Sequence, residues 1–265
     1  MLIDTHTHLD DKQFDKDRDE VIARAFANGV KKIINVGAGL GSSRRSVELA
    51  EKYENIFAAV GFHPHYFNKY GESSFGKIAE LRELARHKKV IAVGEIGLDY
   101  FSHNEKKIGE KEKESQKAGF ISQLDLARKL NLPVIIHCRD AYDDCYEIMQ
   151  KYVDLKFVFH CYGGNMEFTK KLLWYKNIHF SFTGNITYAK AGSEIIEAIK
   201  KIPMNKIILE TDCPYLAPTP MRGKRNEPLL VRYIGKKIAE LKNFSEDDAS
   251  RITTKNASRF FGFVL

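Results

Sequence analysis

Two histidines stand two residues apart near the amino end of the chain, in the segment IDTHTHLD that begins at Ile3. The segment opens with a short hydrophobic run, which favours a β-strand. Alternate side chains of a strand point to the same face, so His6 and His8 can be directed at one point. Two imidazoles directed at one point suit a divalent metal ion. Whether they bind one depends on the further ligands that the chain supplies.

Further potential ligands stand at or just beyond the ends of other hydrophobic runs: Glu95, His137, His160 and Asp212. Imidazole and carboxylate groups bind Zn²⁺, Mn²⁺ or Fe²⁺, and carboxylates with water favour Mg²⁺. With the first pair, these ligands exceed what one tetrahedral ion uses. Two ions that share a bridging carboxylate would use all of them. Paired ions ~3.5–4 Å apart can activate water and stabilise the leaving oxygen of a phosphoester.

Taken singly, each of these residues also has a structural explanation. A histidine at a strand end is often a hydrogen-bonded structural residue, and Asp212 could cap a loop. Taken together, so many unpaired buried polar groups would cost too much free energy. Cys138, Cys161 and Cys213 each directly follow a candidate ligand. Strand alternation turns them toward the surrounding helices, so we expect small buried side chains rather than ligands.

A second set of residues could contact a phosphate group. His63 and His65 belong to the segment GFHPH, where the proline holds its predecessor extended and can fix His63 on the rim of the site. For His65, an exposed loop residue and a substrate contact are equally open. Arg139 follows His137 by two residues, and two arginines of a later loop, Arg222 and Arg225, are also candidates. The planar guanidinium suits phosphate oxygens, although a charged loop is usually only solvated.

Hydrophobic runs that could form strands recur along the whole chain. Most are short, uninterrupted and rich in Val, Ile and Phe, as buried parallel strands are. They are Leu2–His6, Lys32–Val36, Ile56–Gly61, Val90–Glu95, Pro133–His137, Phe157–His160, Ile178–Phe182 and Ile207–Glu210. Helical periodicity lies between them, for example at Val21–Ala27, Ile78–Arg86, Phe120–Leu130 and Ile195–Lys201. Strands that alternate with helices in this way predict a (β/α)8 TIM barrel, in which the candidate ligands meet at one mouth.

An open doubly wound sheet is the alternative fold, but no GxGxxG sequence follows the first strand. The charged segment Ser102–Gln116 predicts a solvated loop that leads into a helix. The segment 214–228 holds four of the seven prolines and predicts a long loop after the last strand. Helices are expected to follow at Leu229–Leu241 and Glu246–Phe260. With neither a repeat nor a linker, residues 1–265 are expected to form a single domain.

The composition, with 43% hydrophobic and 29% charged residues, is that of an ordinary globular protein. We expect no secretory signal, and no apolar run reaches the ~20 residues of a membrane helix. Four scattered cysteines favour reduced thiols in the cytoplasm over a zinc finger or a disulfide framework. The net charge of +7 and the pI of about 9.0 would attract nucleic acid, although charge alone is weak evidence. No obligate protein partner is indicated.

The chain resembles the TatD family of metal-dependent hydrolases, within the amidohydrolase-like barrels. The matching motifs are DTHTHLD (4–10), GFHPH (61–65), GEIGLDY (94–100), HCRDA (137–141), FHCYGG (159–164), SFTG (181–184), ETDCPYLAP (210–218) and RGKRNEP (222–228). Many barrels share the HxH pair, whereas ETDxPYL together with RGKRNEP is much more specific. Other amidohydrolase-like enzymes bridge their ions with a carboxylated lysine, and the glutamate of the fourth strand argues against that branch.

The resemblance implies a role for each matching position. One divalent ion would be held by His6, His8, Glu95 and Asp212. The second would be held by Glu95, His137 and His160, so that Glu95 bridges. Asp212 would orient or deprotonate the attacking water, and His63 would contact the scissile phosphate. Asp212, Glu95 and His63 are therefore the expected catalytic residues, and the ions are expected to be Mg²⁺, Mn²⁺ or Zn²⁺.

The function that the resemblance implies is that of a deoxyribonuclease, often a 3′–5′ exonuclease, in which two metal ions activate water against DNA. The alternative is a metal-dependent ester or amide hydrolase that acts on aminoacyl-tRNA or a small molecule. A nucleic-acid substrate predicts that Arg222 and Arg225 matter and that binding weakens with salt. A third hypothesis, a nucleic-acid-binding module with a structural metal, fits poorly, because structural sites are usually closed and four-coordinate.

Overall fold

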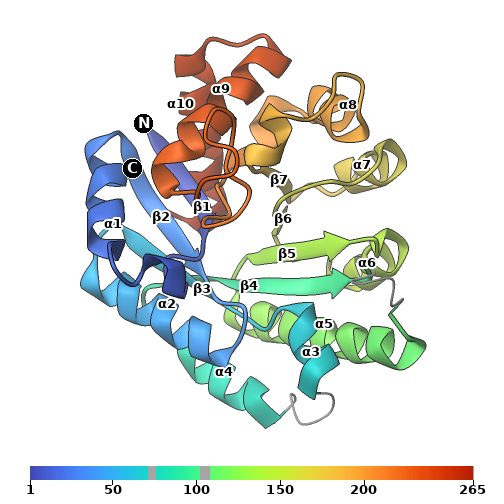
Figure 1. Cartoon of the computed structure of the whole chain (residues 1–265). Coiled ribbons are helices and arrows are strands. Elements are labelled where there is room, and N and C mark those ends of the chain that lie inside the picture. The colour runs from blue at the N-terminus through green and yellow to red at the C-terminus, as the bar shows by residue number, and fades with distance from the viewer. Residues whose placement is uncertain (71–75, 102–107, 265) are drawn as a thin grey trace.

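The computed structural model describes residues 1–70, 76–101 and 108–264, and its centre is one eight-stranded parallel sheet (Figure 1). The strands are β1 (Leu2–Thr7), β2 (Val30–Val36), β3 (Ile56–Val60), β4 (Val90–Asp99), β5 (Val134–Arg139), β6 (Phe157–Phe159), β7 (Ile178–Phe182) and β8 (Ile207–Leu209). Each strand pairs with the next in sequence order, and a parallel bridge between Thr7 and Cys213 joins the last edge to the first. The (β/α)8 barrel is therefore confirmed, and the open doubly wound sheet is wrong.

Helices connect the strands and cover the outside of the barrel (Figure 1). They are α1 (Arg18–Ala27), α2 (Leu40–Lys52), α3 (Pro64–Tyr70), α4 (Ile78–Ala85), α5 (Glu110–Leu130), α6 (Tyr142–Met149), α7 (Met166–Leu173), α8 (Glu194–Lys201), α9 (Val231–Lys242) and α10 (Glu246–Phe261). The long loop after β8 is present, and it ends in a short 3-10 turn, Pro228–Leu230. Within the described ranges, no helix is both long and apolar enough to cross a membrane.

Helix α5 begins well before its predicted start at Phe120. Its first turns are polar, so they give no apolar periodicity that the sequence could show. The carboxylate of Glu112 accepts the backbone N–H of Gly109 at 2.8 Å and stabilises the first turn. Residues 102–107 of the predicted charged loop lie outside the described residues. Residues 110–116, the last part of that predicted loop, are helical, so this part of the prediction is wrong, whereas the helix that was predicted to follow is confirmed with a start at Glu110.

Strand β4 runs beyond Glu95, its predicted end, to Asp99. Its pairing with β5 shifts register between Val93 and Ile96, and such an irregularity re-aims the side chains that it contains. Gly97 has a φ of +144°, and a Cβ atom at this position would collide with the carbonyl oxygen of the β5 residue beside it. Glycine is therefore required for this close approach of the two strands, and the extension carries Asp99 to the rim of the barrel.

A separate apolar cluster fills the inside of the barrel beneath the mouth. It takes residues from seven strands: Ile3, Ile34, Val36, Ala59, Ala92, Ile135, Val158 and Ile208. Ala257, Phe260 and Phe261 of α10 join the same cluster, so α10 closes the end of the barrel at which the strands begin. His137 follows Ile135 by two residues, and His160 follows Val158 in the same way. Strand alternation therefore directs both imidazoles into the barrel, above this apolar floor.

Candidate metal centre

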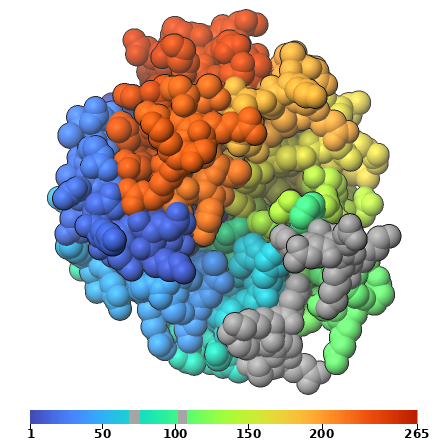
Figure 2. Space-filling model, in the orientation of Figure 1, coloured from blue at the N-terminus to red at the C-terminus, as the bar shows by residue number. Residues whose placement is uncertain are grey.

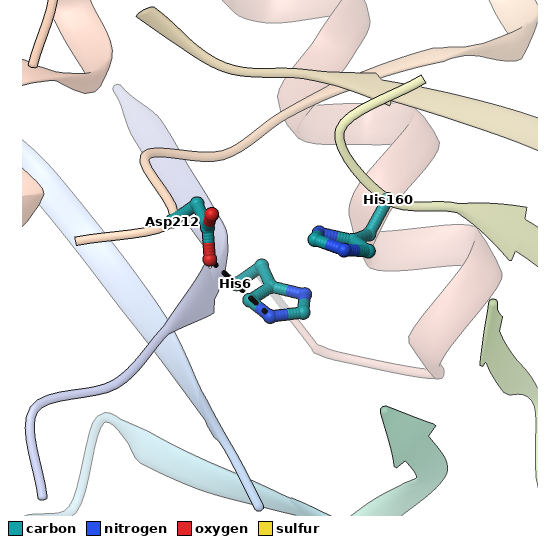
Figure 3. Close-up of side chains that lie close together, drawn as sticks. All are labelled: His6, His160 and Asp212. Atoms are coloured by element: carbon teal, nitrogen blue, oxygen red, sulfur yellow. Dashed lines mark ion pairs between the residues drawn. The ribbon is translucent and has the colours of Figure 1, made fainter. Parts of the chain in front are cut away.

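The six candidate ligands come together where the strands end. Nε2 of His6 and Nε2 of His8 lie 3.3 Å apart, and they lie 3.7 and 3.4 Å from Oδ1 of Asp212. Figure 3 shows the carboxylate of Asp212 directed at His6, and the ring of His160 reaching toward the same place from another strand. The rings of His6 and His160 stack with centroids 4.2 Å apart. Residues from opposite ends of the sequence therefore meet at one point.

Glu95 lies between two pairs of histidines. Its Oε1 lies 2.7 Å from Nδ1 of His137 and 2.8 Å from Nε2 of His160. Its Oε2 lies 3.6 Å from Nε2 of His6 and 4.0 Å from Nε2 of His8. The side chain is only 5% exposed, so the carboxylate is buried among four imidazoles. Each of its oxygens therefore faces a different pair of potential ligands.

This donor set fits divalent cations. Several trios of potential ligands have donor atoms that all lie within 4.8 Å of one another: His6–His160–Asp212, His6–His8–Glu95 and His63–Glu95–His137. Neutral imidazole and carboxylate are the ligands that Zn²⁺ and Mn²⁺ accept. Buried carboxylates also need compensating positive charge. The residues at the mouth thus suit metal binding, while the number and identity of the ions stay a prediction.

The pKa values at the mouth favour ionised carboxylates. Burial opposes charge on Glu95, but the neighbouring imidazoles of His160 and His63 hold the pKa of that carboxyl well below its usual range. Burial also opposes charge on Asp212, and a hydrogen bond with His8 lowers its pKa nevertheless. For His8, burial lowers the pKa, but the Asp212 carboxylate outweighs it and raises the value to about 9. At neutral pH both carboxylates are therefore ionised, and the histidines whose pKa values they raise, His8 and His160, would give up a proton when a cation binds.

His63 and His65 lie on the rim of the same mouth, at the start of α3. Nδ1 of His63 accepts the backbone N–H of His65 at 3.2 Å. A neutral His63 therefore carries its proton on Nε2, which lies 3.7 Å from Oε1 of Glu95. Burial lowers the pKa of His63 to about 3, which keeps the ring neutral. His65 is 45% exposed, and its Nε2 lies 3.2 Å from Oδ2 of Asp99.

Two of the candidate ligand histidines have an outer nitrogen held by an acceptor behind the site. Nε2 of His137 lies 3.0 Å from Oδ2 of Asp99, and Nδ1 of His8 lies 2.9 Å from the carbonyl oxygen of Val36. Such contacts fix which ring nitrogen carries the proton and leave the other for a metal. His137 therefore offers Nδ1 to the site, whereas His8 offers Nε2.

Asp99 is not among the residues predicted from the sequence to act at the site, and neither is Glu210. The carboxylate of Glu210 lies 3.4 Å from Nδ1 of His160. Both acidic residues stand at or just beyond a strand end, which is the position that identified the six candidate ligands. That signal could have found Glu210, which directly follows β8. The same signal could not have found Asp99, because β4 continues beyond the end of its hydrophobic run.

Five of the six candidate ligands and Asp99 line one cavity of about 1290 Å³, together with His63, His65 and Arg139; the five are His8, Glu95, His137, His160 and Asp212. A second part of its wall comes from the amino-terminal helices and the segment before them: Asp10, Asp11, Lys12, Asp15, Arg18, Asp19, Arg45, Glu48 and Lys52. Several cations of this part are paired with carboxylates, such as Arg45 with Asp10 at 3.0 Å and Lys52 with Asp19 at 2.6 Å. The cavity therefore continues as a groove of mixed charge.

Arg139 and Arg222 both lie against aromatic rings. The guanidinium of Arg139 is 3.5 Å from the ring centroid of Phe101, and Arg139 lines the cavity. The guanidinium of Arg222 is 4.3 Å from the ring centroid of Tyr188. Among the described residues that line the cavity, neither Arg222 nor Arg225 is found. Of the three arginines predicted to bind substrate, the structure thus brings Arg139 to the site.

Arg225 ties the loop after β8 to the amino-terminal part of the chain. Its guanidinium donates to both carboxylate oxygens of Asp17, at 2.8 and 2.5 Å, and to the carbonyl oxygen of Gln13 at 2.6 Å. It also lies 4.6 Å from the ring centroid of Phe14. Figure 2 shows the orange loop against the dark-blue amino-terminal segment at this place. These contacts hold one side of the mouth together.

The cysteines beside the candidate ligands are free thiols, and the prediction of buried side chains is right for Cys213 but wrong for Cys138 and Cys161, which are half-buried. Cys138 packs against the core between strands and helices, and Cys213 is fully buried in it. Sγ of Cys161 lies 3.5 Å from the hydroxyl of Thr183. Among the described residues, no metal-binding trio includes a cysteine. That they do not act as ligands stays a prediction.

Comparison with known proteins gives matches over nearly the whole chain. A family model described as TatD related DNase matches residues 3–262. The uncharacterized metal-dependent hydrolase YabD of Bacillus subtilis (strain 168) is 41% identical over 263 residues, which cover 98% of this chain and 99% of the relative. The 3′-5′ ssDNA/RNA exonuclease TatD of Shigella flexneri serotype 5b is 33% identical over 100% of both chains. The crystal structure of YJJV, a TatD homologue from Escherichia coli K12, has a TM-score of 0.88 at 29% identity and covers 99% of this chain and 98% of its own.

Proposed function

The chain belongs to the family of TatD-related DNases, among which are metal-dependent hydrolases, and from this premise we propose that it hydrolyses phosphodiester bonds of DNA as a 3′–5′ exonuclease. Two divalent ions would serve the reaction. The observation that carries the proposal is the placement of Glu95, which directs one oxygen at each of two histidine pairs.

The ligand sets follow from these pairs. One ion would be held by His6, His8, Glu95 and Asp212, and the other by Glu95, His137 and His160. Bound there, divalent ions lower the pKa of water and stabilise negative charge on phosphoryl oxygens. The protein contributes a buried mouth above an apolar floor. Electrostatic interactions are stronger there than in bulk water, which favours charge stabilisation in the transition state.

Asp212 and His63 have separate tasks in this proposal. The Asp212 carboxylate is 13% exposed, so it can be reached from the cavity, and its lowered pKa keeps it ionised at neutral pH. An ionised carboxylate is able to take the proton of the attacking water. His63 is neutral and directs Nε2–H at the site. It would donate this hydrogen bond to a non-bridging phosphate oxygen, with His65 as a second contact at the edge.

Two observations support a nucleic-acid strand as the substrate. The Shigella relative is named as an exonuclease of ssDNA and RNA. On the cavity wall, Arg139 stacks on Phe101. A stacked guanidinium presents its N–H edge to phosphate, and a partly exposed aromatic ring accepts a nucleic-acid base. Arg222 and Arg225 stay candidates for contacts with a longer strand, outside the cavity.

One observation favours a second candidate, an ester or amide hydrolase that acts on aminoacyl-tRNA or a small molecule. Several cations in the amino-terminal part of the groove are paired with carboxylates, as Arg45 is with Asp10. A groove whose cations are already neutralised attracts a polyanion less than the net charge of the chain suggests.

The test uses metal-free protein reloaded with Mg²⁺, Mn²⁺ or Zn²⁺ separately. Each form is given single-stranded DNA, single-stranded RNA and duplex DNA of one sequence, labelled at the 5′ end. A ladder that shortens from the 3′ end supports the exonuclease. Aminoacyl-tRNA and small esters, assayed in parallel, identify the second candidate if they alone are hydrolysed.

Asp212→Asn should lower turnover roughly 10³-fold, because the variant lacks an ionised proton acceptor, while its melting temperature stays close to that of the wild type. Asp154→Asn changes a half-exposed carboxylate that precedes β6, at the other end of the strands, and serves as the control. Near-normal cleavage by Asp212→Asn would contradict the assignment.

A further inference from the structure

Glu210 is a buried carboxylate that lies between two of the ligand histidines. It directly follows β8, and its side chain is 1% exposed. Oε1 lies 3.4 Å from Nδ1 of His160, and Oε2 lies 4.0 Å from Nδ1 of His6. Oε1 also accepts the backbone N–H of Cys161 at 2.5 Å. One carboxylate therefore faces the outer nitrogens of two rings.

Both outer nitrogens are buried and lack a hydrogen-bond partner in the described part of the chain. The inner nitrogens of the same rings face the cluster. Nε2 of His6 lies near Glu95 and Asp212, and Nε2 of His160 lies 2.8 Å from Glu95. A histidine that binds a cation through Nε2 carries its proton on Nδ1. Both rings would then present an N–H group to Glu210.

The burial of Glu210 also indicates that the two imidazole rings donate hydrogen bonds to it. A buried carboxylate is costly unless donors or positive charge compensate it. After it accepts the hydrogen bond of a backbone N–H, the carboxylate still has lone pairs that can accept hydrogen bonds from the two imidazole N–H groups. The separations of 3.4 and 4.0 Å are longer than hydrogen bonds, so each contact would have to shorten when the rings become donors.

We propose that Glu210 is a positioning residue that accepts one hydrogen bond from Nδ1–H of His6 and another from Nδ1–H of His160, and so links the two ion sites through one shared carboxylate. The inference rests on the two-ion arrangement proposed above, in which these histidines belong to different ions. Because both rings would be oriented by one group, a change at Glu210 is expected to affect both ions.

Asp99 provides the matched comparison. Among the histidines proposed as ligands it contacts His137, with Oδ2 at 3.0 Å from Nε2, and within the described residues its other imidazole contact is with His65 on the rim. It is buried like Glu210, with a side chain that is 2% exposed. Loss of its charge should therefore disturb the ion bound by His137 and leave the other ion with its wild-type affinity.

The experiment titrates metal-free wild type, Glu210→Gln and Asp99→Asn with Co²⁺, followed by calorimetry and by the visible absorption of the bound ion. Wild type should bind two ions per chain. Glu210→Gln should raise both dissociation constants about 10–100-fold, the usual effect of losing an outer carboxylate. Asp99→Asn should raise only one. Two unchanged constants in Glu210→Gln, or a single changed one, would overturn the proposal, as would one ion per chain in wild type.

A second measurement keeps the test valid if Glu210→Gln does not fold. Long-range ¹H–¹⁵N spectra of the wild-type protein loaded with Zn²⁺ report which imidazole nitrogen carries the proton. His6 and His160 should both be protonated on Nδ1, and His137 should be protonated on Nε2. A bare Nδ1 on His6 or His160 would refute the shared acceptor. Binding and spectra that agree with the proposal, without cleavage of DNA, would leave it intact and reject only the nuclease function.

Discussion

His63 differs from the neighbouring histidines because its proton faces the cavity. The backbone N–H of His65 occupies Nδ1, so Nε2–H is the group directed at Glu95. We expect His63→Ala to lower kcat roughly 10²–10³-fold, the usual loss of one donor to a transition-state oxygen, with the ion stoichiometry unchanged. His63→Gln retains an N–H donor and should recover part of the rate. Steady-state kinetics together with a Co²⁺ titration check both expectations.

A different result for the ions would change the role of this residue. His63, Glu95 and His137 could also hold a cation together. If His63→Ala lost a bound ion, His63 would be a ligand, and the loss of rate would report on metal binding.

At the scale of elements, the pairing of β4 with β5 positions two acidic residues and one histidine. Gly97→Ala would place a Cβ against the carbonyl of His137, at a φ of +144° that other residues rarely adopt. We expect a loss of about 3 kcal/mol in the free energy of unfolding and weaker binding of the ion at His137. Urea unfolding and ion titration measure the two effects.

Gly41→Ala, near the start of α2, is the control for this substitution. The nearest atom to its added Cβ is the guanidinium Nη1 of Arg45, at 3.6 Å. Alanine is a better helix former than glycine, so the free energy of unfolding should change by less than about 1 kcal/mol. A Gly97→Ala variant as stable as this control would show that β4 and β5 can separate without cost.

The ion pair of Arg225 with Asp17 holds the loop after β8 against the start of α1. Hydrogen bonds from Arg225 lower the pKa of Asp17. Its contribution to stability is therefore present above the ordinary carboxyl pKa, near 3.9, and is lost as pH falls through the lower folded value. Asp17→Asn should cost about 1 kcal/mol from pH 5 to 8, and less below about pH 4. Denaturant unfolding across this range checks it, and a cost that grew on acidification would contradict the pairing.

The sequence predicted the barrel because its strands are short hydrophobic runs, and seven of the eight lie within two residues of their predicted bounds. The end of β4 was missed because Gly94, Gly97 and the charged residues around them do not continue a hydrophobic run. The order of the strands then brings His6, Glu95, His137 and Asp212 to one mouth. The contacts of the outer imidazole nitrogens could not be predicted from the sequence. Glu210 meets His6, for example, only because β1 packs beside β8.

At the scale of the whole molecule, part of the positive charge stabilises the fold. Lys242 donates to carbonyl oxygens in the last turn of α8, whereas Lys89 and Lys206 donate to carbonyl oxygens of the segments that follow α2 and α7. At the end of α8 the helix dipole also favours a cation. Burial lowers the pKa of each of these lysines. The net charge of +7 is therefore not by itself a footprint of nucleic acid.

Salt dependence separates a true phosphate contact from this structural charge. Arg139→Ala should weaken the binding of a single-stranded oligonucleotide and reduce the slope of log K against log salt by roughly 0.7, the share of one phosphate contact. Lys156→Ala, an exposed position just before β6, should change neither quantity. Fluorescence anisotropy at several salt concentrations, with a non-cleavable strand, measures both. Equal slopes for the two variants would remove Arg139 from the substrate path.

The apolar floor formed by α10 and the lower layer of the barrel has a consequence for the traffic of ions. Hydrated cations cannot pass through packed phenylalanine and isoleucine side chains. They would therefore enter and leave through the mouth of the barrel, as the substrate does. A nucleic-acid strand bound over the mouth would then slow the release of the ions. We expect a chelating dye to strip the loaded protein more slowly when an uncleavable oligonucleotide is bound, and stopped-flow release rates would reveal any back exit.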